Sequence, residues 1–439
     1  MLRPRVFLSF VVFILTLSGR PFAATNPNIV LITLNSVRAD RVGFLDTKYP
    51  TPGLDTLAKQ SVVFERAYAQ SPLTIVSDAT ILSGTYPQTH GATELGAPLG
   101  TDVPWLALIL RGRGYRTAAF VGTSALDPKK GFASEFDRGF EVYDSSAGAA
   151  QILHAATWLN GKQSAPFFLW MNIASSGSTD AVAAKVLNTL REKKLFDSGI
   201  LVLTADHGES LGAHGEDGHG VFLYDETIHI PLLVKLPQNQ LSGKRVSSRV
   251  RALDIAPTLL EAAGIPVPPQ MQGQSLLRVA KSATASDLPV YAGTEFPRQA
   301  FGWSPLESWR SGKYLYVRAP KPELYDLSAD PDAMHDLTTS SKAIAQTLAA
   351  QLDGFDAHFS HDKNVGAQLS SSEMQKLASL GYVGLQKSPT TGNAVQGTDP
   401  KDVITIANQT LAALANLERA KTDTAIVALQ QVAAKQPAA

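Results

Sequence analysis

The sequence predicts an α/β fold built on one large, mostly parallel β-sheet that is sandwiched between helices. Short apolar runs rich in β-branched and aromatic residues alternate along the chain with longer stretches of amphipathic spacing, which is the order of successive strand–helix–strand units. The chain has 439 residues, of which 44% are hydrophobic, and this is enough for one large core and a smaller second one. A single small domain is therefore excluded.

The elements of the predicted sheet follow one another in a regular order. Strands are predicted at residues 28–34, 62–68, 117–121, 166–173, 199–204 and 231–235, and helices at 103–113, 147–159 and 179–192. Thr51 followed by Pro52 predicts the capped start of a further helix. Functional loops are expected at the carboxyl ends of parallel strands, and Asn35 and Asp206 each come directly after one.

The C-terminal third of the chain has a different pattern of predicted elements. Short strands over 290–326 and a helix over 340–355 predict a small sheet-plus-helix subdomain. Residues 386–399 are rich in Ser, Pro, Thr, Gly and Asn and predict a flexible linker. After it, 401–418 and 422–435 predict one helical hairpin, which is fewer than the three repeats a helical stack needs. The hairpin is expected to dock on the main domain or to fray.

The first residues have the order of a secretory signal. Arg3 and Arg5 precede the apolar run 6–17, and small residues including Ala24 follow it, so residues 1–24 are predicted to direct export to the periplasm or the extracellular space. The apolar run is short for a membrane span, and an uncleaved N-terminal anchor is the alternative.

Charge and cysteine content narrow the function further. The 39 basic and 39 acidic side chains give a formal net charge of zero, which argues against a binder of nucleic acid or of an anionic membrane. The chain has no cysteine, so disulfides are excluded even in an exporting compartment, and stability must come from the core and any bound metal.

Asp206 and His207 form the most informative pair, because they follow the apolar run 200–203 and precede Gly208. A carboxylate beside an imidazole suits a divalent cation such as Ca, Mn or Zn, and the glycine lets the backbone turn sharply. Two ligands alone do not make a metal site, and a solvated histidine in a surface turn is the alternative.

Many further segments, in one order over residues 28–385, resemble the sulfatase branch of the alkaline-phosphatase superfamily. These segments are N-I-V-L-I-T-L at 28–34, T-P-G-L-D at 51–55, A-Y-A-Q-S-P-L-T at 67–74, S-G-T-Y-P at 83–87, D-H-G-E at 206–209, G-H-G at 218–220, L-D-I-A-P-T-L at 253–259, E-L-Y-D-L at 323–327 and L-G-Y-V-G at 380–384. The resemblance implies an alkaline-phosphatase-like sheet with a small C-terminal subdomain, and in similar proteins a tetratricopeptide array opens where the hairpin stands here. The implied division is 1–24 signal peptide, 25–285 α/β catalytic-type domain, 286–385 C-terminal subdomain, 386–399 linker and 400–439 truncated tetratricopeptide-like hairpin.

The resemblance also implies a nucleophile at a helix N-terminus. Residues 74–78, T-I-V-S-D, stand where the family has the pattern Cys/Ser/Thr-x-Pro-Ser-Arg/His, which places Thr74 at the nucleophile and Ser77 among the candidate substrate contacts. There, backbone donors and the helix dipole favour an anionic oxygen. Thr74 cannot become the formylglycine of true sulfatases, and it is similar to the threonine of phosphodiesterase relatives. An ordinary helix N-cap is the alternative for Thr74.

The remaining implied roles fall on five residues. Asn35, Asp206 and His207 are the candidate ligands of one divalent metal ion, and Asn35 is the weak one because relatives have an aspartate there. His219 stands where sulfatases keep a sulfate-contacting lysine, so it is a candidate catalytic residue. His90 is a candidate substrate contact, with a structural turn histidine as the alternative.

Three departures from the family pattern weaken the expected chemistry. The amide of Asn35 lacks a charge, which costs a metal site on the order of several kcal/mol. Asp78 replaces a cation that holds the substrate oxyanion, and we expect an anion there to oppose binding. Residues 172–177 replace a His-x-x-x-Pro-His segment, so a leaving-group acid is missing and the cleft is expected to be open.

Two functions follow from this pattern. The first is an exported, metal-dependent hydrolase of small-molecule or glycan esters of sulfate, phosphate or phosphonate, weakly active through Thr74. The alternative is a catalytically impaired protein that binds an anion, or a protein partner through the C-terminal hairpin. A serine-hydrolase elbow at 208–212 (G-E-S-L-G) is rejected because the following residues are poor helix formers. Arg310 and Lys313 are interpreted as surface charges of a strand.

Overall fold

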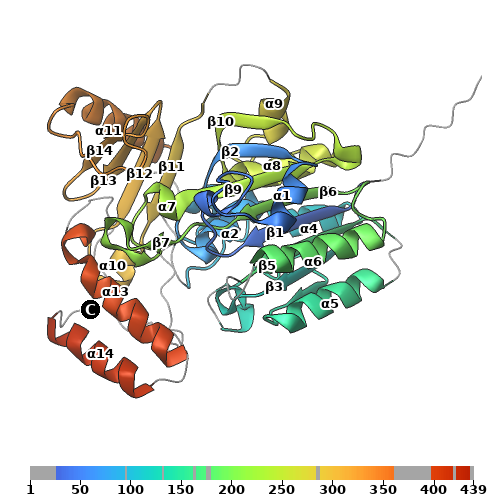
Figure 1. The fold of residues 1–439 in the computed structure, drawn as a ribbon, viewed down its shortest axis with the longest axis horizontal. Coiled ribbons are helices and arrows are strands. Elements are labelled where there is room, and N and C mark those ends of the chain that lie inside the picture. Colours follow the sequence, from blue (N-terminus) through green and yellow to red (C-terminus); the bar gives the residue numbers. More distant parts are fainter. Residues whose placement is uncertain are drawn as a thin grey trace, which may run out of the picture.

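The computed structural model describes residues 26–93, 96–130, 133–161, 165–174, 179–282, 287–359, 397–418 and 422–435. Its centre is an eight-stranded sheet in the order β10-β2-β9-β6-β1-β5-β3-β4 (Figure 1). The strands are β1 (Ile29–Leu34), β2 (Val62–Tyr68), β3 (Arg116–Val121), β4 (Val142–Asp144), β5 (Phe167–Ile173), β6 (Ile200–Ala205), β9 (His229–Lys235) and β10 (Arg245–Arg251). Only β9 runs antiparallel to its neighbours, β2 and β6, so the prediction of a mostly parallel sheet is confirmed.

The three central strands end level with one another. Every residue of β1, β5 and β6 is buried, as expected for parallel strands covered on both faces. Leu34 pairs in register with Ile173 on one side and Ala205 on the other. The next residues of β1 and β6, Asn35 and Asp206, therefore leave the same edge of the sheet side by side.

Helices cover both faces of this sheet (Figure 1). On one face α1 (Pro52–Ala58) and α5 (Ala149–Asn160) pack against α6 (Thr179–Glu192). On the other face of the sheet, α2 packs against three further helices. This second set is α2 (Thr74–Ser83), α3 (Pro87–His90), α4 (Leu106–Gly112) and α8 (Ile255–Ala262), with α9 (Leu276–Lys281) packed on α8.

Two local details differ from the predicted elements. Thr51 stands at the N-cap of α1 without a capping bond from its side chain, and the carboxylate of Asp180 on α6 instead accepts from the backbone N–H groups of Gly53 and Leu54. Strand β10 was not predicted, because its sequence RVSSRVR carries three arginines and lacks an apolar run.

A second, antiparallel sheet lies beside the first (Figure 1). It has the order β11 (Val290–Thr294), β12 (Leu306–Ser311), β13 (Tyr314–Arg318) and β14 (Glu323–Asp326), and α11 (Lys342–Ala357) packs on β12 and β13. Short helices α7 (Asp225–Ile228) and α10 (Phe296–Phe301) lie near it. Predicting Arg310 as a surface charge is wrong: its side chain is 1% exposed and donates to Asp225 and to the carbonyl oxygen of Leu223. Lys313 is exposed, as predicted.

Helices α13 (Pro400–Glu418) and α14 (Thr422–Lys435) pack on each other as a hairpin. The first of them docks on the chain: Asn408 accepts a hydrogen bond from the backbone of Asp217 and donates one to the carbonyl oxygen of Gly215. A tetratricopeptide relationship of this hairpin is not confirmed. The predicted signal peptide and most of the predicted linker lie outside the described residues, and among the described helices none is long and apolar enough to cross a membrane.

Candidate functional site

The carboxyl ends of β1 and β6 meet the first turn of α2 and bring four predicted site residues together. The side-chain nitrogen of Asn35 donates to Thr74 Oγ1 and to Asp206 Oδ2, each over 2.9 Å. Thr74 Oγ1 also lies 3.1 Å from His207 Nε2. The sequence therefore located a real cluster, even though its members are up to 172 positions apart.

Thr74 is the first residue of α2 and not its N-cap, which contradicts the structural alternative for this residue. The N-cap is Leu73, whose side chain makes no capping bond, so the first turn of α2 has no side-chain cap over its N–H groups. These groups and the positive end of the helix dipole lie where a negatively charged oxygen would approach Thr74.

His207 is fully buried and its ring is held in one orientation. His207 Nδ1 lies 2.7 Å from the carbonyl oxygen of Gly208, which can only accept, so we assign the proton to Nδ1 and the lone pair to Nε2. Burial lowers the pKa of His207 below its usual value, which favours the neutral ring. Gly208 is required here, because a Cβ at this position would meet the backbone of Glu226 at 2.1 Å.

The carboxylate of Asp206 is already satisfied by hydrogen-bond donors. Besides Asn35, it accepts from the backbone N–H groups of Ser36 and His207, over 2.9 and 2.7 Å. The amide of Asn35 thus presents its nitrogen where a cation between Thr74 and Asp206 would need an oxygen.

Sulfatase-type chemistry generally uses a divalent metal, so the fit of these residues to one matters. The described part of the chain holds no group of three or more His, Cys, Asp or Glu side chains placed to bind a metal ion. One carboxylate, one imidazole and an amide facing the wrong way do not fit a tightly held divalent ion. The roles of Asp206, His207 and Asn35 as ligands of Ca, Mn or Zn remain predictions.

Asp78 is fully buried in the interior behind the cluster, which differs from the expected anion beside the substrate. Its Oδ2 accepts from the side chain of Asn172 over 3.2 Å, while Oδ1 has no hydrogen-bond partner in the described part of the chain. Burial, together with the neighbouring charge of Asp206, raises the pKa of Asp78 well above its usual value. A protonated Asp78 carries no charge to repel an anionic substrate.

This buried polar network extends into the sheet. Thr33 Oγ1 accepts from Trp170 Nε1 and from Asn172 Nδ2, both over 3.1 Å. Sequence analysis missed the network, although a polar Thr33 and Asn172 inside two otherwise apolar strands were its signal.

The two predicted substrate contacts do not face the cluster as free groups. Ser77 is buried and donates to the backbone carbonyl of Asp206, which ties α2 to the end of β6. His90 is buried, with Nε2 beside Thr80 Oγ1 and Nδ1 accepting from the backbone of Ala92, and burial lowers its pKa to about 3. The geometry favours the structural turn histidine.

His219 reaches the cluster from a loop. Its ring centre lies 4.3 Å from that of His207, and its Nδ1 is 3.1 Å from Glu209 Oε2. Burial lowers the pKa of His219, but the hydrogen bond and charge of Glu209 outweigh it, so the pKa lies above the usual value and favours the cationic ring. Glu209 was not predicted as a partner, although it belongs to the D-H-G-E segment.

The same loop engages the hydroxyl of Ser210. Ser210 Oγ donates to the carbonyl oxygen of Glu216, and a 3-10 turn at Ala213–Gly215, not an α-helix, follows it directly. The buried carboxylate of Glu216 accepts from the backbone of Val221 and Phe222 and so shapes the loop around His219. Residues 175–178, on which the prediction of an open cleft depends, lie outside the described residues.

Comparison with known families agrees with this geometry. Residues 27–171 match the model named sulfatase, and residues 215–357 match the model for the C-terminal part of N-sulphoglucosamine sulphohydrolase. Over these two segments the chain is similar to the sulfatase family. Its landmarks had predicted that family.

The individual relatives are only distantly similar to this chain in sequence. The chain is 30% identical to arylsulfatase K of Mus musculus over 190 residues, which cover 41% of the chain and about a third (34%) of that relative. It is 25% identical to the ulvan-active sulfatase of Formosa agariphila over 417 residues, covering 75% of the chain and 80% of the relative. The phosphonate monoester hydrolase of Agrobacterium radiobacter has the same fold, with a TM-score of 0.64, 18% identity, and coverage of 76% of this chain and 96% of that one.

Proposed function

We propose that this sulfatase-family protein is exported, binds a sulfate ester or a related phosphate or phosphonate ester, and hydrolyses it slowly through Thr74. The observation that supports this most is the Thr74 hydroxyl, which lies at the start of α2 between a donor, Asn35, and the imidazole of His207. A threonine with an ordinary packing role does not need both partners.

The two hydrogen bonds of Thr74 define a route for its proton. Asn35 donates to Thr74 Oγ1, so the hydroxyl proton is free to point at the lone pair of His207 Nε2. In the first step Thr74 Oγ1 bonds to the sulfur or phosphorus, the bond to the leaving oxygen breaks, and His207 takes the hydroxyl proton. Between the steps the departing oxygen, which leaves as an anion, takes a proton from solvent, and the His207 ring releases its extra proton to solvent. In the second step water attacks the sulfur or phosphorus and loses a proton to the neutral ring, the bond to Thr74 Oγ1 breaks, and that oxygen takes the proton back from His207.

Positive charge for the ester oxygens comes from two sources. The N–H groups of the first turn of α2 supply fixed donors, and His219, cationic beside Glu209, adds a charge next to His207. Both would stabilise charge on the non-bridging oxygens while Thr74 attacks.

The same geometry explains why turnover should be slow. Losing one group that stabilises developing charge typically costs about 10²- to 10³-fold in rate. Here the Asn35 amide replaces a charge, and Asp78 replaces a cation with a buried carboxyl group. Nothing in the cluster stands in for the missing leaving-group acid.

A second function, binding without turnover, is favoured by one observation. The Asn35 amide links Thr74 to Asp206 directly, so the cluster is internally satisfied without a metal ion. In that case the protein would bind an anion, or a partner through the C-terminal hairpin, and Thr74 would serve only as a donor.

Turnover of an aryl sulfate, a phosphate monoester, a phosphate diester and a phosphonate monoester separates the two functions. We expect slow hydrolysis of at least one ester, lost by about 10²-fold or more in Thr74→Ala and largely kept in Thr74→Ser, which retains the hydroxyl. Absent turnover in the wild type, with sulfate still raising the unfolding temperature, would support the binding function. Equal rates in the wild type and Thr74→Ala would reject Thr74 as the nucleophile.

A further inference from the structure

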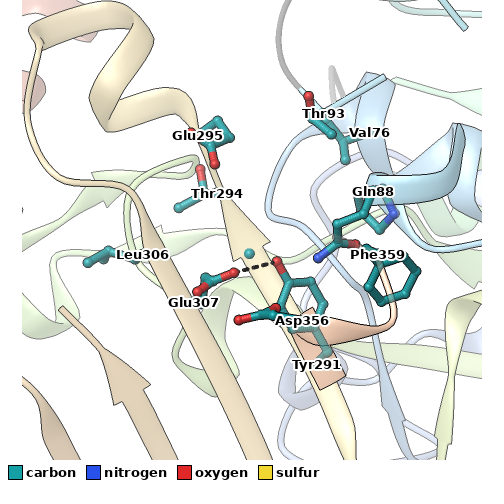
Figure 2. A pocket seen from close by; sticks show the side chains of 12 residues that line it. Val76, Gln88, Thr93, Tyr291, Thr294, Glu295, Leu306, Glu307, Asp356 and Phe359 are labelled. Carbon is teal, nitrogen blue, oxygen red and sulfur yellow. Dashed lines mark hydrogen bonds between the residues drawn. The ribbon is translucent and has the colours of Figure 1, made fainter. Parts of the chain in front are cut away.

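A cavity of about 100 Å³ lies beside the candidate site (Figure 2). One wall comes from α2 and the segment around α3, with Val76, Gln88 and Thr93. The other comes from β11, β12 and the end of α11. The second wall carries Tyr291, Thr294, Glu295, Leu306, Glu307 and Asp356. This space accommodates several water-sized groups, comparable to one edge of a sugar ring.

The polar groups of the cavity are mostly hydrogen-bond acceptors. Figure 2 shows Glu307 and Asp356 close together at its base, with the Tyr291 hydroxyl donating to Glu307 Oε1 over 3.2 Å. Gln88 contributes a buried side-chain oxygen without a hydrogen-bond partner in the described part of the chain. A ligand that fills the cavity must therefore bring donors.

Negative charge in and around the cavity exceeds its positive charge. Arg318 pairs with Glu307 and Asp356, and it is shared with a third carboxylate, Asp353, outside the cavity. Glu295 pairs with Arg298. Four carboxylates thus surround two guanidinium groups.

The carboxylates of the cavity have raised pKa values, chiefly because they are buried. Burial, and then the neighbouring Asp356, raise the pKa of Glu307 to about 7, and burial raises the pKa of Glu295. A buried carboxylate gains from an added cation, which replaces the proton it would otherwise hold.

The cavity adjoins the candidate site through the backbone. Val76, which lines the cavity, lies in the first turn of α2 with Thr74 but on another side of the helix. Across the cavity, Thr294 Oγ1 donates to the carbonyl oxygen of Gly220 over 2.6 Å, and Gly220 directly follows His219. An ester held at Thr74 could therefore extend its non-reacting part into the cavity.

We propose that the cavity binds an ammonium group on the non-reacting part of the substrate, as in an amino sugar. This rests on the proposed function, since it assigns the substrate class of the same site. An ammonium group has three donors and no acceptor, which suits Glu307, Glu295 and the orphan oxygen of Gln88. A second sulfate or a carboxylate would be repelled by the same groups, so the substrate is a mono-anionic ester with a free amine.

The test compares binding of glucosamine and N-acetylglucosamine near neutral pH by calorimetry, because the two share a ring and differ in the charge of the nitrogen. We expect the wild type to bind glucosamine at least tenfold more tightly. Glu307→Gln should weaken glucosamine binding by about tenfold, because it removes a charge in contact with the ammonium while keeping the side-chain shape.

Asp353→Asn is the matched control, since Asp353 pairs with the same Arg318 but does not line the cavity. It should change the affinity less than twofold. Glu295→Gln gives a second test on the opposite side of the cavity, and unfolding midpoints of the variants verify that they are folded.

Equal binding of the two sugars, no binding of either, or equal loss in Glu307→Gln and Asp353→Asn would overturn the proposal. Calcium binding that depends on Glu307, without glucosamine binding, would overturn it in favour of a bare cation. Neither sugar reacts, so failure here leaves hydrolysis through Thr74 intact. Conversely, selective glucosamine binding together with turnover unaffected by Thr74→Ala would reject only the proposed nucleophile.

Discussion

The candidate centre and the cavity beside it differ in how the negative charge of their carboxylates is balanced. In the centre, Asp206 is satisfied by an amide and two backbone N–H groups, and Asp78 is buried with a raised pKa. In the cavity, carboxylates pair with the guanidinium groups of Arg318 and Arg298 and still exceed them. The centre of this sulfatase-fold protein is thus nearly neutral without a cation. The neighbouring cavity, in contrast, has an excess of carboxylates that an added cation would balance.

The difference shows which parts of such a site resist sequence change. A buried carboxylate can be satisfied by amides and backbone N–H groups, as Asp206 is by those of Asn35 and Ser36. A cluster of carboxylates has no such substitute and needs cations, since hydrogen-bond donors do not cancel repulsion between like charges. Charge changes should therefore have large effects in the cavity and smaller effects in the centre.

The largest effect is expected from Arg318→Met. Arg318 is 15% exposed and holds Glu307 and Asp356, so its loss leaves two buried carboxylates without their cation. We expect the free energy of unfolding to fall by about 3 kcal/mol or more at pH 7.5, measured by denaturant titration. The loss should shrink below pH 7, where Glu307, whose pKa is raised to about 7, becomes protonated.

Lys321→Met serves as the control for Arg318→Met, because Lys321 forms an exposed pair with Asp402 and should matter by less than about 0.5 kcal/mol. Equal effects of the two substitutions would show that the cavity charges are solvated, and the contrast between the two regions would fail.

A smaller effect, of opposite kind, is expected from Asn35→Asp. The new carboxylate loses both donations of the amide and faces Asp206, so the variant should be less stable than the wild type without metal. Calcium should restore it, by about 2.7 kcal/mol at a hundred times its dissociation constant. Thermal unfolding with and without millimolar calcium measures this.

Asn188→Asp, which adds an exposed carboxylate near the C-terminal end of α6, is the control and should show no calcium response. The decisive comparison is between the calcium responses of the wild type and Asn35→Asp. If calcium stabilises it as strongly as Asn35→Asp, the centre is a metal site after all, and its apparent neutrality is wrong.

Sequence patterns predicted the scaffold well because burial repeats along the chain. The apolar runs of β1 and β6 were enough to place Asn35 and Asp206 at one edge of a sheet, and the family resemblance at 74–78 and 206–209 implied that Thr74 and His207 lie with them. Those signals are local, and parallel-sheet topology converts them into proximity.

The polar environment of the site could not be predicted in the same way. Whether Asn35 presents nitrogen or oxygen, and whether Asp78 faces solvent or the interior, depends on side chains contributed by distant elements such as Asn172 on β5. The cavity is harder still, since Gln88, Glu307 and Asp356 carry no shared motif and meet only when the two sheets pack. Arg310 was misassigned for the same reason: the segment that buries it lies 85 positions away.

Asp78→Asn should change how stability depends on pH, and the sign of that change tests the neutrality of the centre most directly. The pKa of Asp78 is raised above its unfolded value of 3.8, so between the two pKa values the folded chain holds a proton that the unfolded chain has lost. The stability of the wild type should then fall as pH rises, by up to about 1.4 kcal/mol per pH unit, and Asp78→Asn should remove this slope. Denaturant titrations between pH 4.5 and 7.5 measure it, with Asp254→Asn as the contrasting control, expected to lose stability because Arg251 is left unpaired. Parallel pH profiles for the wild type and Asp78→Asn would mean that Asp78 is ionised in the folded protein, and a charge so deeply buried beside Asp206 would require a cation in the centre.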